Sequence, residues 1–150
     1  MTADLQKLLT WLSPAFPVGA FAWSAGLETA IVSRLVHDRQ TAEDWISGAL
    51  LHGSLRTDAI FLAHAHRSPR SPEKLQDLAD LCLALTPARE RAAETTQTGN
   101  AFAKAGAARP VEPPLALPDP CPYPIAVGAL AGAHAIGLLD TLLALSLIHI

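Results

Sequence analysis

Prolines divide this chain into segments, and between them the apolar residues recur at helical spacing. The richest stretch, GAARPVEPPLALPDPCP at residues 106–122, contains six prolines. Proline has no backbone N–H and restricts the residue before it, so neither a helix nor a central strand continues through such a stretch. We expect an extended surface crossover there. Elsewhere apolar residues return every three or four positions and no segment alternates like a strand, so the pattern predicts an all-α bundle.

The periodic segments predict about seven helices. Thr41, with Asp44 three residues later, resembles a capping box and should begin a long helix that ends near His66. Thr86 should cap a later helix, with Pro87 in its first turn. The expected helices span residues 4–12, 25–36, 41–66, 72–83, 86–105 and 123–137, and a last one begins at 138.

Composition excludes several classes of function. Half of the residues are apolar, 17% are charged and the net charge is −3, which argues against nucleic-acid binding, since that requires a basic surface. The sequence contains no run of about 18 apolar residues, so we expect no membrane-spanning helix. Cys82 and Cys121 lack any partner motif and suit a reducing cytoplasm. The N-terminal MTADLQKLLTWL has no basic segment before an apolar core, so we expect no signal peptide.

No residue pattern predicts a catalytic or metal centre. CxxC, HExxH, P-loop and GxSxG motifs do not occur. His64 continues an apolar stripe and should be buried, whereas His66 should be solvated. Arg91 and Glu94 can pair at i, i+3 on an exposed strip with Glu90. Asp58 should make a structural polar contact. The alternative is a small helical metal-binding or enzymatic domain whose ligands converge only in three dimensions, drawn from His37, His52, His134 and Asp58.

Small residues form smooth faces on two of the expected helices. On the first they are spaced by three or four residues from Ala88 to Gly106 and include Gly99; on the second they include Gly128 and Gly132. Glycine inside a helix costs about 1 kcal/mol relative to alanine, so a close helix contact should compensate. We expect packing inside the chain, with a subunit contact as the alternative. By contrast, Arg70 should be an ordinary surface residue.

The segment LSPAFPVGAFAWSAGLE, residues 12–28, is too rigid and too apolar for a plain connection. Ser13 can cap, two prolines fix φ, and Gly19 allows a turn. Its four large apolar side chains should contribute partly to the core and partly to a docking surface: Phe16, Val18, Phe21 and Trp23. The sequence therefore predicts a preformed structured loop.

This segment resembles the signature of UreF-type urease accessory proteins, which reads approximately SPxxPxGxxxxSxGLE. The later ARERAAETTQTGNAF resembles the alanine-arginine-glutamate helix of that family, and YPIAVG resembles its third marker, after the crossover. The three markers occur in family order over residues 4–145. The positions that carry the resemblance are Ser13, Pro14, Pro17, Gly19, Ser24, Gly26, Leu27 and Glu28, then Ala88, Arg89, Glu90, Arg91 and Gly99, then Tyr123, Pro124, Val127 and Gly128.

The resemblance implies a non-enzymatic, cytoplasmic assembly factor that forms a homodimer within its complex. It implies binding to the UreD/UreH-type accessory protein, the UreG-type GTPase and the urease apoprotein, with no nucleic-acid or membrane partner. It implies that nickel is handled by the assembled complex and that the chain itself holds no cofactor tightly. Because family members continue through further helices, residues 1–150 are expected to be a single domain that is incomplete at its C-terminus.

Overall fold

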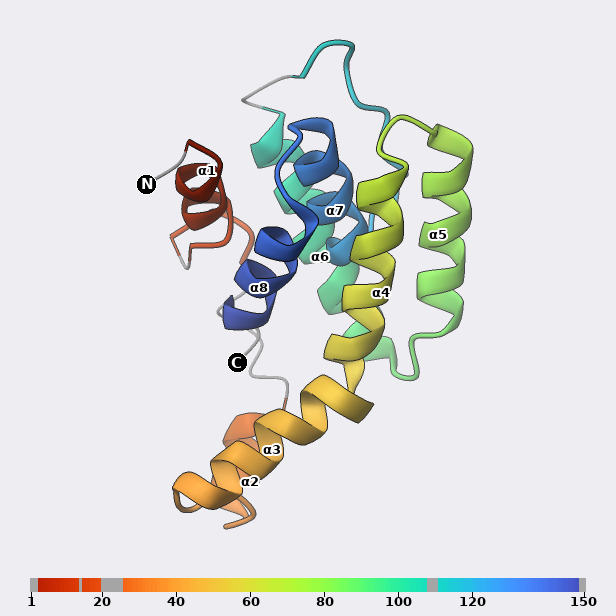
Figure 1. Cartoon of the computed structure of the whole chain (residues 1–150). Helices are drawn as coiled ribbons and strands as arrows, with labels where there is room; N and C mark the ends of the chain where they lie inside the picture. The colour runs from red at the N-terminus through yellow and green to blue at the C-terminus, as the bar shows by residue number, and fades with distance from the viewer. Residues whose placement is uncertain (1–2, 14, 20–25, 108–110, 149–150) are drawn as a thin grey trace.

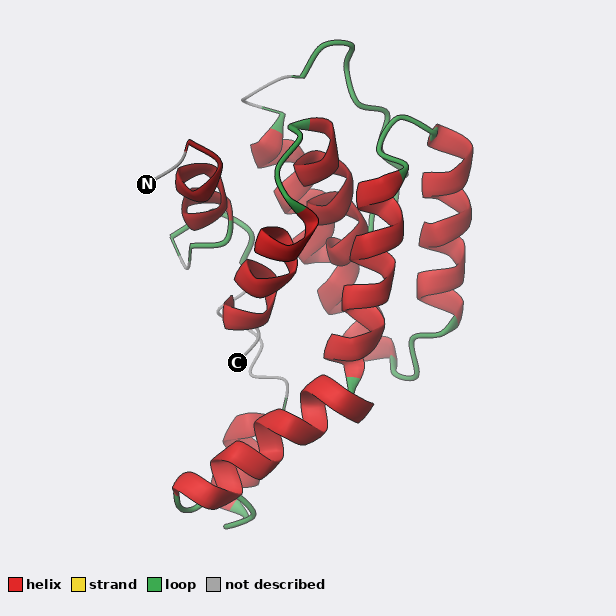
Figure 2. Ribbon diagram, viewed as in Figure 1, coloured by secondary structure: helices red, strands yellow, loops and turns green. Residues whose placement is uncertain are grey.

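The chain folds into helices joined by turns and one long crossover (Figures 1 and 2). The computed structural model describes residues 3–13, 15–19, 26–107 and 111–148. These residues form eight helices and no strand, which confirms the predicted all-α fold. The helices are α1 (Ala3–Trp11), α2 (Leu27–Val32), α3 (Arg39–His52), α4 (Ser54–Arg67), α5 (Pro72–Ala84), α6 (Arg89–Gly106), α7 (Tyr123–Ala133) and α8 (Leu138–Ile148).

Helix α7 is the centre of the molecule. Every residue from Tyr123 to Ala131 is buried, as expected for a helix that is apolar all round. Helices α4 and α6 pack along α7, while α5 and α8 contact it at its margins (Figure 1). Helix α1 lies against α8. The third marker thus begins the helix on which α4, α5, α6 and α8 pack.

Glycines let α4 approach α7 closely. A Cβ atom on Gly128 would overlap the carbonyl oxygen of Leu62 and lie 3.1 Å from the Cβ of Ala65. A Cβ on Gly132 would likewise overlap the carbonyl oxygen of His66. The small residues of α7 therefore serve packing within the chain, as predicted.

The long helix predicted over 41–66 is two helices, which raises the number from about seven to eight. Gly53 separates α3 from α4 in an extended conformation, with φ −94° and ψ −168°. The cap also differs from the prediction, because Asp38 caps α3 and Thr41 is the third residue of the helix. The Asp38 carboxylate accepts a hydrogen bond from the Thr41 N–H at 2.8 Å, and Thr41 Oγ1 accepts one from the Asp38 N–H at 3.0 Å.

Thr86 does not cap the helix that follows it. Its hydroxyl donates to the carbonyl oxygen of Cys82 at 2.8 Å and so closes the end of α5. Helix α6 begins at Arg89, with Ala88 at the N-cap position. Helix α2 is also shorter than predicted, because the chain turns at Arg34, where φ is 58°.

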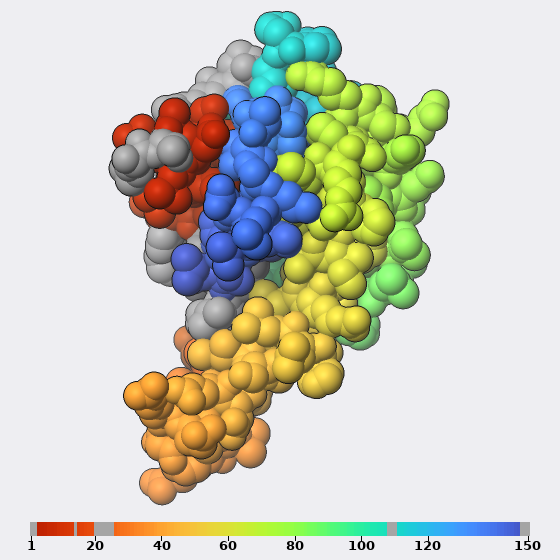
Figure 3. All heavy atoms as spheres, viewed as in Figure 1, coloured from red at the N-terminus to blue at the C-terminus, as the bar shows by residue number. Residues whose placement is uncertain are grey.

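Residues 26–52, which we call the arm, project from the bundle (Figures 1 and 3). None of the 14 residues of α3 is buried. The arm also exposes large apolar side chains, namely Ile31, Val32, Leu35, Leu50 and Leu51. Within the described residues, its connection to the bundle runs through the α3–α4 junction at Gly53.

The crossover is extended, as predicted, and its described part, residues 111–122, contains no helix or strand. Arg70 holds it in place, because its guanidinium donates to the carbonyl oxygens of Pro113 at 2.8 Å and Glu112 at 3.1 Å. Arg70 is exposed, as predicted for a surface residue, but these two contacts were not predicted, since sequence spacing gives no sign of them. At the far end Asn100 Oδ1 accepts a hydrogen bond from the Cys121 N–H at 2.8 Å.

Candidate functional site

The three family-like markers meet around the ring of Phe102 on α6. Trp11 contacts it edge-on with ring centroids 6.1 Å apart, and Tyr123 does so at 5.6 Å. Phe16, from the loop after α1, packs on it at 5.5 Å. Each such aromatic pair adds about 0.5–1.5 kcal/mol beyond its area burial. Of the four large apolar side chains expected in the core or on a docking surface, the two that the structure describes, Phe16 and Val18, pack against the core.

Phe102 was not among the predicted site residues. It is the last residue of the second marker, ARERAAETTQTGNAF, and the only aromatic in an otherwise small and polar helix. A large ring among small neighbours was the available signal. Its neighbour one turn earlier, Gly99, was predicted as a close-contact position.

Gly99 allows the chain entering α7 to cross α6. A Cβ on Gly99 would overlap the Cys121 carbonyl oxygen and come within 2.6 Å of the Tyr123 nitrogen. The Tyr123 N–H donates to Thr95 Oγ1 at 3.2 Å on the same face of α6. Burial raises the pKa of Tyr123, so its hydroxyl stays protonated at neutral pH. Gly99, Tyr123 and Gly128 thus hold the fold.

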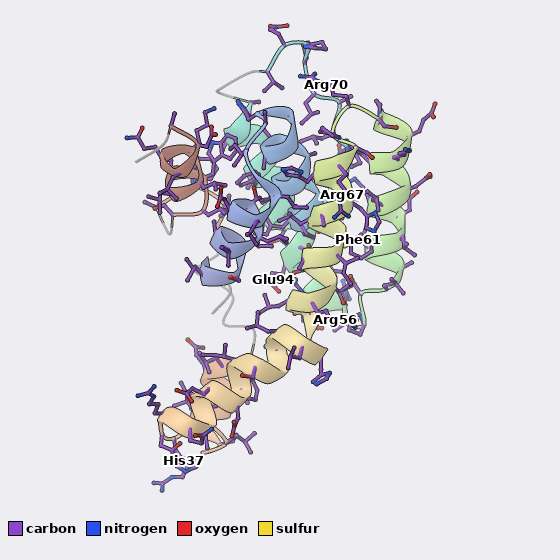
Figure 4. The ribbon with its side chains drawn as sticks, in the orientation of Figure 1. His37, Arg56, Phe61, Arg67, Arg70 and Glu94 are labelled. Carbon is purple, nitrogen blue, oxygen red and sulfur yellow. The ribbon has the colours of Figure 1, made fainter. Side chains whose placement is uncertain are left out.

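Arg91 is the cation of a three-residue ion cluster that joins α6 to α4. Its guanidinium binds the carboxylate of Asp58, and its other terminal nitrogen lies 2.9 Å from Glu94 Oε2 (Figure 4 labels Glu94). The side chains are only 8% exposed for Asp58, 21% for Arg91 and 15% for Glu94. The predicted structural contact of Asp58 is confirmed, whereas the exposed strip predicted for Arg91 and Glu94 was wrong, because α4 covers them.

Burial and pairing act in opposite directions within this cluster. Burial raises the pKa of Asp58 to about 6, although the charge of Arg91 opposes the shift. Burial lowers the pKa of Arg91, but the two carboxylates outweigh that effect and leave it raised. Arg91 therefore stays charged, and its role is to hold α4 and α6 together rather than to face solvent.

Most described polar and glycine positions of the first marker shape the backbone. Gly19 and Gly26 have φ of 72° and 86°, a region that favours glycine. Gly26 directly precedes α2. Ser13 Oγ accepts a hydrogen bond from the Ala15 N–H at 3.1 Å, which closes a turn after α1. Pro14 and Ser24, with Phe21 and Trp23, lie outside the described residues.

Apart from Gly19, Gly26 and the N-cap residue Ala88, four described marker residues are exposed: Pro17, Glu28, Arg89 and Glu90. Within the described ranges no ion pair or hydrogen bond uses the side chains of Glu28, Arg89 or Glu90. Glu28 and Glu90 lie in the first turns of α2 and α6, where a negative charge is favourable. These four positions are the candidate contacts to another molecule.

The histidines do not converge. His37 and His52 are exposed on the arm, whereas His134 packs its ring edge-on against Trp11 at 5.1 Å. His64 is exposed and His66 is half-buried, which reverses the prediction, because His66 Nε2 lies 2.7 Å from the Ile136 carbonyl oxygen. Among the described residues no group of three or more His, Cys, Asp or Glu side chains could hold a metal ion.

The two cysteines are buried free thiols. Burial raises the pKa of Cys82 to about 11 and that of Cys121 to about 12. Metal binding and nucleophilic attack require the thiolate. Both thiols therefore stay protonated and serve as small apolar core residues.

A family model named UreF matches residues 36–148 of the chain. The chain belongs to the UreF family. It is 47% identical over 149 residues to the urease accessory protein UreF of Rhizobium etli (strain CIAT 652), covering 96% of this chain and 67% of that protein. It is 45% identical to the UreF of Agrobacterium fabrum, covering 95% and 64%, and 42% identical to UreF 1 of Brucella canis, covering 95% and 63%.

This UreF chain spans about two thirds of the length of the curated relatives it matches. The relatives are named as accessory proteins of urease, which agrees with the resemblance of the three markers. No helix among the described residues is both long and apolar enough to span a membrane. In this UreF fold the markers divide into buried residues that join α4, α6 and α7 and residues that remain exposed.

Proposed function

We propose that this chain acts in the cytoplasm as a non-enzymatic urease accessory protein that assists the insertion of nickel into the urease active site. It does so by assembling with a UreD/UreH-type protein, a UreG-type GTPase and the urease apoprotein. Nickel is the cargo of the assembled complex, and the chain itself binds no cofactor tightly. The proposal includes a homodimer within that complex.

One observation carries the proposal: several residues of the family markers are exposed and make no contact that holds the fold. Glu28, Arg89 and Glu90 carry charges that no described residue of the chain neutralises. Exposed charged residues that make no hydrogen bond or ion pair within the chain are typical of binding surfaces that set orientation and specificity. An accessory protein that works by docking needs such residues and needs no catalytic group.

The test is co-purification of the chain with the UreD/UreH-type and UreG-type proteins of the same organism, combined with urease activation in cells. We expect Arg89→Ala, and a double variant carrying Glu28→Ala and Glu90→Ala, to lower both recovery of the partners and urease activity. The variants should melt close to the unchanged chain.

Matched controls are available on other helices. Lys104→Ala removes an exposed cation from the last turn of α6, and Asp140→Ala removes an exposed carboxylate from the first turn of α8. Both should leave recovery and activation unchanged. Failure of the unchanged chain to recover either partner would refute the proposal. Tight, stoichiometric nickel binding by the isolated chain would instead favour the metal-binding alternative.

A further inference from the structure

Arginines follow α4 from its first turn to the turn beyond its last residue (Figure 4). Arg56, Arg67 and Arg70 are all exposed. Within the described part of the chain no carboxylate pairs with any of these three guanidinium groups, and the two hydrogen bonds of Arg70 go to uncharged carbonyl oxygens. The arginines therefore keep their positive charge, on a chain whose net charge is −3.

Two of these arginines share one face of α4 with an exposed apolar residue. At 100° per residue, Arg56, Ile60 and Arg67 fall within an arc of about 40°. Ile60 is 47% exposed, whereas the next residue, Phe61, is buried on the opposite side of the helix. We call Arg56, Ile60 and Arg67 the α4 face. It has an apolar centre between two cations.

The only carboxylate of α4 lies away from this face. Asp58 is on the buried side, where it binds the guanidinium of Arg91 on α6. The exposed side of α4 is therefore left without a negative charge. The same ion pair holds the first turns of α4 and α6 at one end of the bundle, the end that also carries the exposed marker residues Arg89 and Glu90 (Figure 1).

We propose that the α4 face binds an acidic surface of a partner protein, which places carboxylates on both sides of an apolar contact to Ile60. Opposite charges across an interface speed the encounter of the right partner and disfavour wrong ones. A second copy of this face is not the occupant, because a two-fold contact of the face with itself would bring arginines opposite arginines. The inference rests on the proposed function, since it names a surface through which that assembly forms.

The spacing along α4 defines the partner surface more closely. Arg56 and Arg67 are three turns apart, about 16 Å along the helix axis at 1.5 Å per residue. A partner helix that runs beside α4 would meet both arginines with carboxylates three turns apart and would place an apolar side chain between them. One face of a 14-residue helix is at the low end of interface sizes, so it adds rate and specificity to contacts made elsewhere in the complex.

The test measures association and dissociation rates of the whole chain with each purified partner, namely the UreD/UreH-type protein, the UreG-type GTPase and the urease apoprotein. We expect a double variant with Arg56→Glu and Arg67→Glu to associate about tenfold or more slowly with one of them at about 50 mM salt. The rate of the unchanged chain should fall at about 300 mM salt, and the variant should lose this dependence. Arg70 is left in place, because its substitution would also release the crossover.

The apolar centre has a different expected signature. Ile60→Ser removes no charge, so the association rate should stay close to that of the unchanged chain. The dissociation rate should rise severalfold, because the complex loses an apolar contact that forms only after encounter.

Matched variants separate charge at this face from charge in general. Arg34→Glu with Lys104→Glu makes the same change in net charge at exposed cations on the arm and on α6, and it should leave all rates unchanged. Arg56→Lys with Arg67→Lys keeps the charge and should associate nearly as fast as the unchanged chain. Melting curves establish that every variant is folded.

Equal rates for the charge-reversal variant and its matched control, with all three partners, would overturn the inference. A loss of binding that is the same at both salt concentrations would also overturn it, because charge would then not be the cause. Binding of a duplex oligonucleotide that the charge reversal abolishes would assign the face to nucleic acid instead. In these cases the unchanged chain still binds its partners and the proposed function stands, whereas an unchanged chain that binds none of them would refute the proposed function and this inference with it.

Discussion

At the scale of single residues, the same chemical change should have opposite effects at two helical glycines. Gly99→Ala would place a Cβ against the Cys121 carbonyl oxygen, and we expect it to lower the free energy of unfolding by about 1–3 kcal/mol. Gly48→Ala, in α3, meets nothing within 4 Å and should raise it by about 0.5–1 kcal/mol through helix propensity. Urea unfolding of both variants measures the difference. Equal effects at the two positions would show that α6 and the start of α7 are not tightly packed.

The carboxyl group of Asp58 couples the stability of the fold to pH. Burial raises its pKa from 3.8 to about 6, so between these values the folded chain holds a proton that the unfolded chain has released. The free energy of unfolding therefore falls as pH rises through this window. Relative to an Asp58→Asn variant, which cannot ionise, we expect the unchanged chain to lose up to about 3 kcal/mol between about pH 4 and pH 7.

Urea unfolding of both chains at several pH values measures this difference. If the unchanged chain instead becomes more stable than the Asp58→Asn variant as pH rises, the attraction of Arg91 exceeds the cost of burying the carboxylate. In that case the pKa of Asp58 would lie below its ordinary value.

At the scale of elements, helix periodicity predicted most of the structure and failed where a glycine or a side-chain hydrogen bond redirected the backbone. Gly53 fitted the apolar stripe of a long helix, and nothing in the spacing distinguished it from Gly48, which is helical. Thr86 and Thr41 are both residue types that suit an N-cap. However, the Thr86 hydroxyl donates to the carbonyl oxygen of Cys82 in the preceding helix, and Asp38 rather than Thr41 caps α3. Such choices depend on which partner is nearer in space.

The crossover should depend on Arg70, whose contacts also lay beyond the reach of the sequence. Arg70→Ala removes the two hydrogen bonds to Pro113 and Glu112, so we expect faster cleavage within the crossover in limited proteolysis. Arg34→Ala, on the exposed turn of the arm, is the control and should leave that cleavage rate unchanged. Identical digestion patterns for all three chains would show that the crossover is held by its own prolines.

At the scale of the whole molecule, the sequence predicted the class of fold and the family but not the division of the markers. Glu28, Gly99 and Tyr123 carry the resemblance equally, one in each of the three markers, yet Gly99 and Tyr123 are buried and Glu28 is exposed. The burial of α7 on all sides followed from its composition. The ion pair of Asp58 and Arg91 could not be predicted from composition, because the two residues are 33 positions apart and meet only after α4 and α6 have packed.

Exposed leucines on α8 should dominate the solubility of the chain. Leu139, Leu143 and Leu147 recur at intervals of four and are 68%, 55% and 77% exposed. A contiguous apolar stripe of this kind favours aggregation. We expect a variant with Leu139→Glu and Leu143→Glu to scatter less light at tens of micromolar while melting close to the unchanged chain.

The same substitution at Leu145, which is 3% exposed, should instead unfold the chain. Scattering that does not change in the double variant would place the aggregation surface elsewhere, with the exposed leucines of the arm as the next candidates.

The single extended residue at Gly53 is a point about which the arm can rotate relative to the bundle. Helix α3 is about 20 Å long at 1.5 Å per residue, so a rotation of only about 10° at its base moves its far end by roughly 4 Å. Glu28, the exposed carboxylate of the first marker, is carried on the arm, while Arg89 and Glu90 are fixed to the bundle. The spacing between the two groups of exposed marker residues therefore depends on the backbone torsions at this glycine. The affinity of a partner that contacts both groups would therefore depend on the angle of the arm as well as on the side chains themselves.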